Sequence, residues 1–308
     1  MLGSFFSIAP IFAVIALGWL TVRIGLIKET TGNGVADFVF VIAMPLMLFR
    51  TMATVELPAS PPWAFWLSYY LGMAAVWTIV TTIARTRFGR NAQESGIIGF
   101  AVGQSNIVLL GIPLVLRVFG DEGRVPLFLL VAINLPLTMS IATFLVETAE
   151  AGESRLLSII RKLCINPILI GIAAGMVYRQ FGIPLPEIAA TSLKFIADAA
   201  APCALFATGT ALSRYSLKGG DTQLLSIVVA LKLLVFPLFV FLLTTKVFGL
   251  PPIWAAVATV LAGTPSGVNA YLLAERYKLG MGVTSGAVAV STVLSLVTTT
   301  FWLWLMTA

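Results

Sequence analysis

Two short polar stretches interrupt otherwise apolar segments and contain the residues best suited to bind a small solute. They lie within residues 103–113 and 263–269, and the candidate binding residues in them are Gln104, Ser105, Asn106, Thr264, Pro265, Ser266 and Asn269. An asparagine amide both donates and accepts hydrogen bonds. At the start of a half-helix it can bind a carboxylate or merely satisfy the broken backbone, and both interpretations stay open for Asn106 and Asn269.

Residues that weaken helices accompany these polar groups. Gly103 and Pro113 flank the first stretch, and Gly263 opens the second. Inside a bilayer, non-helical backbone is tolerated only where it is buried in protein or lines a cavity. Two such interruptions at corresponding places in two halves of a chain indicate the binding site of a secondary transporter.

The composition is that of an integral membrane protein. Of 308 residues, 59% are hydrophobic and 10% are charged, with a mean hydropathy of +1.00, well outside the range of soluble domains. The first apolar run lacks a basic leader and a cleavage site, so we interpret it as a retained span. Cys164 and Cys203 lie in apolar segments and suggest no disulfide framework. Without histidine, a Ser-His-Asp triad is impossible, and neither a metal-ligand cluster nor a phosphate-binding loop is found. We therefore expect no enzyme, cofactor or metal site.

The elements that must position these residues are ten segments close to the length of a membrane-spanning helix. They are residues 5–24, 34–53, 63–84, 95–118, 125–146, 164–181, 188–212, 223–246, 253–276 and 283–306. The alternative, nine or eleven spans, requires one segment to be re-entrant. Twelve basic residues fall on one side of this arrangement, and they are Arg23, Lys28, Arg85, Arg87, Arg90, Arg155, Arg161, Lys162, Arg214, Lys218, Arg276 and Lys278. Five fall on the other, so the positive-inside rule predicts that both termini are extracytoplasmic.

The two halves of the chain repeat. Glycines and prolines recur 157 residues apart, as in the pairs Gly18 and Gly175 or Pro45 and Pro202, and the second polar stretch follows the first at an interval of 160. Chance identity among small residues is the alternative explanation. Residues 1–150 and 151–308 then form two five-helix repeats, and because five is odd, the second is inverted relative to the first. The predicted hinges are Pro45, Pro202, Gly103, Gly263 and Pro113.

Charged residues inside membrane segments are costly and are functional by default. Lys194 and Asp198 are one helical turn apart and can pair, and Asp37 is equivalent to Lys194 in the repeat. Asp198 either couples transport to a proton or sodium ion or forms a structural ion pair. Lys232 lies deep in the eighth segment and either faces the substrate's negative charge or serves Asp198. Asn134 is interpreted as a packing residue.

Three motifs resemble the auxin efflux carrier family, which includes the plant PIN-FORMED exporters and bacterial carriers of malonate and related organic acids. They are SNIVLLGIPL at 105–114, APCALFATG at 201–209 and PSGVN at 265–269. The resemblance implies ten helices in two inverted repeats, crossing fourth and ninth helices, transport of a small organic anion and association between protomers. The plant exporters have proline where this chain has Ser105, so the resemblance does not identify the substrate of this chain.

We therefore predict a secondary carrier that transports a carboxylate by alternating access, in a bacterial inner (plasma) membrane, as a homodimer and without nucleic-acid partners. Two alternatives remain. A sodium-coupled symporter resembling the bile acid carriers would depend on sodium, and a non-transporting receptor or scaffold would bind ligand from one side without flux.

Overall fold

The protein is a bundle of helices in the part of the chain that the computed structural model describes, residues 1–54, 61–147, 165–215 and 221–307. No strand occurs within these ranges, and a single isolated β-bridge joins Ser105 to Ser266. The prediction of an all-α membrane protein is confirmed at this level. Some predicted features lie outside the described residues, namely the boundary at 150/151, Cys164, Arg155, Arg161, Lys162 and Lys218.

Helical structure is found at every predicted segment, with bounds within a few residues of the expected ones. The helices of the first half are α1 (Leu2–Arg23), α2 (Glu29–Phe38), η1 (Val39–Ala43), α3 (Met44–Thr54), α4 (Trp63–Phe88), α5 (Ala92–Gly103), η2 (Ile107–Gly111), α6 (Ile112–Phe119) and α7 (Arg124–Glu147). Those of the second half are α9 (Pro167–Gln180), α10 (Glu187–Leu212), α11 (Thr222–Ala230), η3 (Leu231–Val235), α12 (Phe236–Leu242), η4 (Leu243–Val247), α13 (Pro252–Ala262), α14 (Val268–Tyr277) and α15 (Met281–Thr307).

Seven continuous helical segments of the described chain are long and apolar enough to cross a membrane. The two segments predicted to be broken do not reach that length as single helices. Their apolar halves are the shorter helices Ile107–Phe119 and Pro252–Ala262. Length and composition therefore establish a multi-pass membrane protein, and the number of ten crossings stays a prediction.

Three of the π-helical turns have a common cause. The turns η1, η2 and η3 each end two residues before a proline, namely Pro45, Pro113 and Pro237. A proline has no N–H to offer the carbonyl four residues back, and its ring clashes with that carbonyl, so the preceding turn widens. At Pro237 the carbonyl left free belongs to Leu233, and Trp302 Nε1 donates to it over 2.9 Å. Pro202, by contrast, lies within the continuous helix α10.

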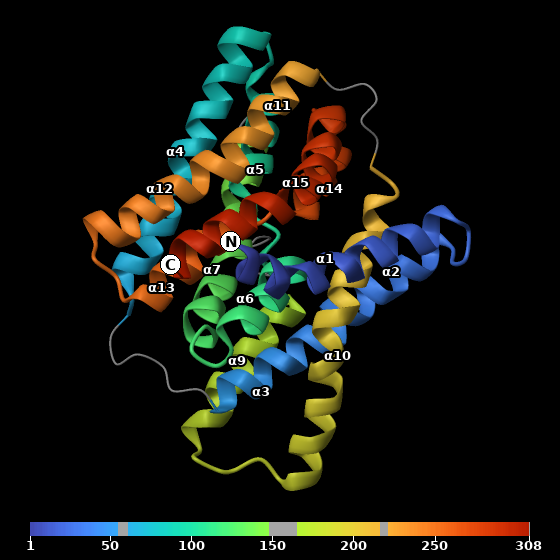
Figure 1. Ribbon diagram of the computed structural model, residues 1–308, viewed down its shortest axis with the longest axis vertical. Helices are drawn as coiled ribbons and strands as arrows, with labels where there is room; N and C mark the ends of the chain where they lie inside the picture. The colour runs from blue at the N-terminus through green and yellow to red at the C-terminus, as the bar shows by residue number, and fades with distance from the viewer. Residues whose placement is uncertain (55–60, 148–164, 216–220, 308) are drawn as a thin grey trace.

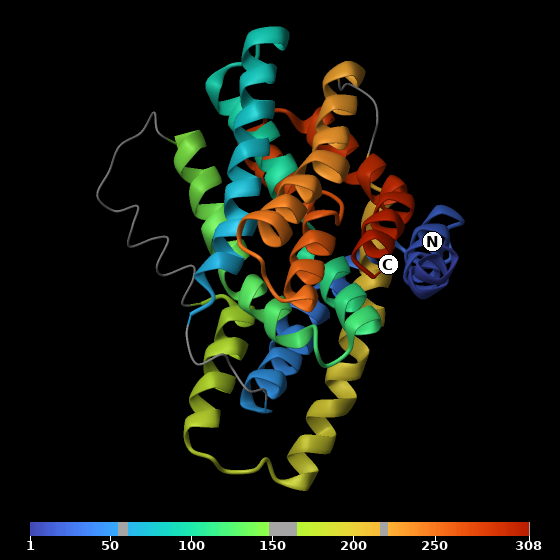
Figure 2. The same cartoon turned by 60° about the vertical axis from the view of Figure 1, so that its left-hand side comes forward.

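The helices pack in two groups (Figure 1). The first group contains α1, α2, α3, α9 and α10, with α1 packed on α10 and α3 on α9. The second group contains α4, α5, α7 and α11 to α15, with α5 packed on α4 and α7 and with α13 and α14 packed on α15. Figure 2 shows the same groups from another side. Each group combines helices from both halves of the sequence, so neither half packs as a unit of its own.

Glycines allow very close approach inside the first group. A Cβ at Gly209 of α10 would lie 2.0 Å from the carbonyl oxygen of Ile15 in α1. A Cβ at Gly171 of α9 would lie 2.3 Å from the carbonyl oxygen of Pro45 in α3. Helices in lipid associate through such small residues, because lipid provides no hydrophobic force that drives helices together. The two main contacts of the first group are therefore backbone against backbone.

Candidate functional site

The two interrupted segments meet at their breaks. We call residues 104–106, between α5 and η2, the first break, and residues 263–267, between α13 and α14, the second break. The N–H of Asn106 donates to the carbonyl of Pro265 over 2.9 Å, and the N–H of Gly267 donates to the carbonyl of Gln104 over 2.7 Å. Each break thus supplies partners for backbone groups that the other leaves unpaired. This pairing allows extended backbone to exist in the interior of a membrane protein.

The side chains of the second break are used to hold the backbone. Thr264 Oγ1 donates to the carbonyl of Leu261 over 2.7 Å. Ser266 Oγ donates to the carbonyl of Ala101 in α5 over 2.7 Å, and its N–H donates to Ser291 Oγ over 3.0 Å. Both side chains are fully buried. Their hydrogen bonds therefore fix how the two interrupted helices lie against each other.

The predicted hinge residues flank this junction. Gly103 is the last residue of α5, and a Cβ there would lie 2.9 Å from the ring of Trp77. Gly263 is the residue after α13, and a Cβ there would lie 3.1 Å from the ring of Trp302. Both glycines are needed for packing against tryptophan. Pro113 is the second residue of α6 and directly follows the widened turn η2 within the continuous segment Ile107–Phe119.

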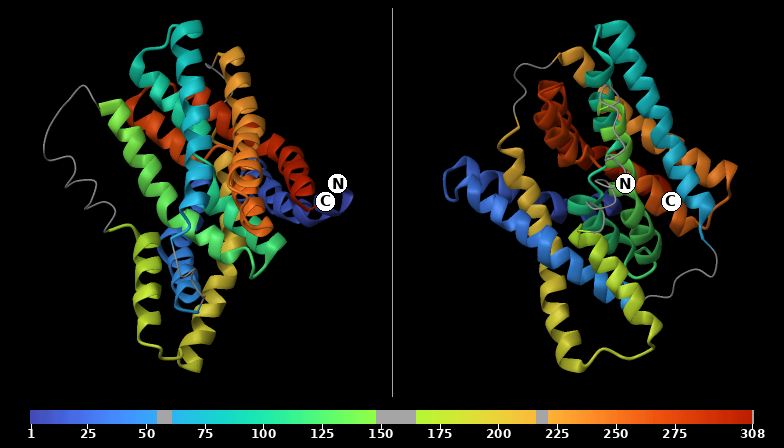
Figure 3. Two further views of the ribbon diagram at one scale, coloured as in Figure 1. Left: turned by 90° about the vertical axis from the view of Figure 1, so that its left-hand side faces the viewer. Right: turned by 180° about the vertical axis from the view of Figure 1, so that it is seen from behind.

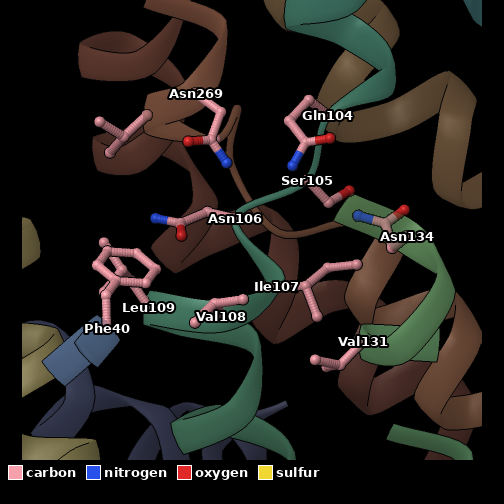
Figure 4. Close-up of a pocket in the computed structure, with 12 residues that line it drawn as sticks. Phe40, Gln104, Ser105, Asn106, Ile107, Val108, Leu109, Val131, Asn134 and Asn269 are labelled. Carbon is pink, nitrogen blue, oxygen red and sulfur yellow. The ribbon is translucent and has the colours of Figure 1, made fainter. Parts of the chain in front are cut away.

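A small cavity lies against the breaks (Figure 4). It has a volume of about 30 Å³, enough for one or two water molecules. Its lining residues come from η1, both breaks, η2, α7 and α14, and they are Phe40, Gln104, Ser105, Asn106, Ile107, Val108, Leu109, Val131, Asn134, Gly267, Val268 and Asn269. Phe40 lies in η1, between α2 and α3 of the first helix group, and η2 packs against α10 of that group. The breaks, α7 and α14, which supply the rest of the lining, belong to segments of the second group. The cavity therefore lies where the two groups meet.

Two helix N-termini open onto this cavity. The continuous helical segment beginning at Ile107 starts at the first break, and α14 begins at Val268 after the second. The first N–H groups of a helix have no partner within it, and the helix dipole makes this end positive. Residues of both first turns line the cavity. The arrangement favours an anion at this place.

Asn106 and Asn269 have side chains free for a ligand. Asn106 precedes η2, yet its side chain makes no capping bond. Within the described ranges, neither amide has a side-chain hydrogen bond to another residue, and both line the cavity. The interpretation that Asn106 only satisfies broken backbone therefore does not describe its side chain. Its main chain alone performs that task.

Sequence reasoning underrated Asn134, which it assigned to packing. The structure places this buried residue in the cavity wall, and its Oδ1 has no hydrogen-bond partner among the described residues. The neighbouring Thr138 Oγ1 lies 2.6 Å from Gln104 Oε1 and 2.6 Å from the Asn134 carbonyl. The bond to Thr138 turns the Gln104 amide so that its NH₂ remains available. In Figure 4 the amides of Gln104, Asn106, Asn134 and Asn269 are grouped around the breaks.

Lys232 lies at the junction of the breaks. It is 0% exposed within π-helical turn η3. Its Nζ donates to Ser105 Oγ over 2.5 Å and to the carbonyl of Ala262, the last residue of α13, over 2.9 Å. Tyr69, which the sequence analysis did not identify, donates from its hydroxyl to the same Ser105 Oγ over 3.1 Å. The only sequence signal for Tyr69 was a hydroxyl inside an apolar segment.

The other predicted charges lie elsewhere. Lys194 Nζ is 2.8 Å from Asp198 Oδ2, and both side chains are 58% exposed on α10. The possible pair is thus present, and Asp198 is not the partner of Lys232. Asp37 is exposed on α2. Among the residues described, no group of three acidic or cysteine side chains is placed to hold a metal ion.

Comparison with known proteins agrees with this picture of a polar site in a membrane bundle. The family model described as Membrane transport protein matches residues 4–303. A protein of Rhizobium meliloti named "Putative malonate transporter" is 26% identical over 97% of this chain and 94% of its own length. An uncharacterized transporter of Methanothermobacter thermautotrophicus is 24% identical over 98% of each chain. Auxin efflux carrier component 8 of Arabidopsis thaliana is 23% identical over 96% of this chain and 95% of its own.

Proposed function

Because this chain belongs to the membrane transport protein family, the family of the auxin efflux carriers, we propose that it is a secondary transporter that carries a small carboxylate by alternating access. Transport of a small molecule across a membrane follows from the family, and no enzymatic activity is involved. The observation that carries the proposal is the cavity at the paired breaks. Two positive helix ends and four amide side chains converge there.

The fold behind this proposal is ten transmembrane helices in two inverted repeats, residues 1–150 and 151–308, with both termini extracytoplasmic. Reciprocal contacts support the repeat. A Cβ at Gly18 would meet the carbonyl oxygen of Phe206 at 2.3 Å, and one at Gly175 would meet that of Phe49 at 2.5 Å. Both glycines and both phenylalanines are 157 apart. The termini also lie close together in both views of Figure 3, and an even number of crossings would place both on the same side of the membrane.

Thiol labelling tests this topology. Cysteine replaces either Arg87, exposed at the end of α4, or Lys246, exposed at the end of η4, in a background without Cys164 and Cys203. We expect a membrane-impermeant reagent to label position 246 in intact cells and position 87 only after the cells are opened. The reverse pattern would place the termini in the cytoplasm. Labelling of both positions in intact cells would contradict an odd number of crossings between them.

The anion is proposed to bind between the breaks. Asn106 and Asn269 donate amide hydrogen bonds to the carboxylate, Gln104 and Ser105 add further donors, and the second break with Thr264, Pro265 and Ser266 keeps the crossing in shape. A negatively charged acceptor strengthens each of these hydrogen bonds. Lys232 is a positive side chain that bonds to the lining, through Ser105.

Substrate entry requires movement. A cavity of about 30 Å³ holds water but not a carboxylic acid, because ligand pockets are typically about 300–1,000 Å³. The cavity lies between the two helix groups, so it opens if the group carrying both breaks shifts against the group of α1, α2, α3, α9 and α10. The proposed hinges are Pro45, Pro202, Gly103, Gly263 and Pro113. Two openings on opposite sides constitute alternating access.

The energy source is proposed to be either an ion gradient or the membrane potential. One charge that crosses 100 mV is worth about 2.3 kcal/mol, which suffices to drive an anion outward without a coupling ion. Asp198, Lys194 and Asp37 are the charged groups proposed for coupling to a proton or sodium ion. We propose further that the protein resides in a bacterial inner membrane and forms a homodimer.

Ligand-dependent thermal stability tests the proposed substrate class. We expect malonate or another small carboxylate to raise the melting temperature of the purified protein, and indole-3-acetate serves as the aromatic comparison. Binding at a concentration a hundredfold above Kd adds about 2.7 kcal/mol to stability. Malonamide, which has the same shape but no charge, is the control. An equal shift with malonamide, or no uptake of the stabilising acid into proteoliposomes, would refute carboxylate transport.

A further inference from the structure

Lys232 Nζ is hydrogen-bonded to a hydroxyl group and a backbone carbonyl rather than to a carboxylate. Its two hydrogen-bond acceptors are Ser105 Oγ and the carbonyl of Ala262, and it lies 4.7 Å from the centre of the Phe236 ring. No carboxylate of residues 1–54, 61–147, 165–215 or 221–307 forms an ion pair with it. A buried charge normally requires a partner of opposite sign. Here the partner is the negative end of an interrupted helix.

The same oxygen atoms would suit a metal cation. Ala262 ends α13, so its carbonyl belongs to the C-terminal end of a half-helix, where the dipole is negative. In carriers with interrupted helices, such carbonyl groups coordinate the sodium ion. The Ser105 hydroxyl is an oxygen ligand of the same hard type. The ammonium group thus occupies a position that an inorganic cation would otherwise take.

We propose that Lys232 is a built-in cation that replaces a coupling sodium ion, so that anion transport by this protein does not depend on sodium. The inference rests on the proposed function and narrows it, because it removes sodium from the possible coupling ions. Lys232, Ser105 and Ala262 all belong to segments of the second helix group, together with both breaks. The positive charge therefore moves with the binding site.

Lys232 is connected to the cavity through its hydrogen bond to Ser105. A hydroxyl group accepts two hydrogen bonds and donates one. Lys232 and Tyr69 both donate to Ser105 Oγ. The hydroxyl hydrogen of Ser105 is therefore not needed for either bond and can be donated to a ligand in the cavity that Ser105 lines. Lys232 does not line the cavity, so it acts as a positioning residue. It makes Ser105 a donor to the anion and adds a positive charge one hydroxyl away.

The first experiment needs no transported substrate. Melting temperatures of the wild type, Lys232→Ala, Lys232→Met and Lys246→Ala are compared in sodium chloride and in choline chloride at equal ionic strength. We expect only Lys232→Ala to be stabilised by sodium, and also by methylammonium, because truncation opens the oxygen-lined space. Methionine fills that space with apolar atoms, and exposed Lys246 is the matched control. Stabilisation of the wild type by sodium would overturn the proposal. So would a folded Lys232→Ala protein whose melting temperature neither sodium nor methylammonium raises.

The second experiment measures malonate uptake by proteoliposomes. We expect wild-type uptake to be equal with and without sodium. Lys232→Met should raise the apparent KM about 10-fold, because it removes the positive charge that lies one hydroxyl group from the anion and that strengthens the Ser105 hydrogen bond, and Lys232→Arg should restore most of the affinity. Wild-type uptake that requires sodium contradicts the inference and leaves the carrier function intact. Absence of any uptake refutes the proposed function, whereas the melting experiment still decides the role of Lys232.

Discussion

Asn106→Ala should weaken carboxylate binding about 10- to 100-fold and reduce uptake correspondingly, because it removes a charge-assisted hydrogen bond worth about 1.5–3 kcal/mol. The Asn106 amide lines the cavity and makes no capping bond, so nothing in the folded protein competes for its donors. Its role in the crossing is carried by the N–H that donates to Pro265. Alanine keeps that N–H, so the variant should remain folded.

The measurement is substrate affinity by thermal shift together with initial uptake rates in proteoliposomes. Asn33→Ala is the matched control, since Asn33 is exposed on α2 and far along the chain from both breaks. Unchanged affinity in Asn106→Ala would remove the assigned site. If Asn106→Ala lowered the melting temperature by the same amount with and without ligand, Asn106 would instead have a structural role.

Asn269 allows the site to be tested as a pair. If Asn106 and Asn269 bind one carboxylate from the two breaks, the changes in binding free energy caused by their alanine substitutions should not be additive. The second substitution then acts on an anion that the first has already made less well positioned. Independent contributions would give the product of the two single effects. A double-mutant cycle on ligand affinity separates these cases.

The sequence predicted the helices well, because hydropathy in a membrane protein leaves few choices for the backbone. The two breaks were recognisable because Gly103, Gly263 and the adjacent polar residues contradict a regular span. Residue type could not reveal which of their polar side chains bind the protein backbone and which face the cavity. Ser266 and Asn269 are both polar residues of one short stretch, yet Ser266 binds the backbone of α5 and Asn269 faces the cavity.

Contacts between distant segments were beyond the reach of the sequence. Lys232 and Ser105 are 127 residues apart, and only the packing of η3 against the breaks joins them. The alternative that Lys232 serves Asp198 was chemically sensible, but Asp198 lies on the exposed face of α10 with Lys194. Asn134 and Tyr69 carried only the weak signal of a polar atom inside an apolar span. Such atoms in membrane helices more often bond to a neighbouring backbone than to a ligand.

Gly209→Ala should destabilise the protein by about 2 kcal/mol or more, the range expected for overpacking against atoms that cannot move aside. The added Cβ would lie 2.0 Å from the carbonyl oxygen of Ile15 and 2.9 Å from the N atom of Trp19. Both belong to the backbone of α1, so the two helices must separate along their contact.

The matched substitution is Gly34→Ala in α2, where no atom lies within 4 Å of the added Cβ. Alanine in a helix that has room for it should stabilise by about 0.4–1 kcal/mol. Melting temperature and the monodisperse fraction after detergent extraction measure both variants. Equal behaviour of the two would mean that α1 and α10 are not in backbone contact. A selective loss in Gly209→Ala would show that small residues hold the first helix group together, which gives the moving breaks a rigid partner to shift against.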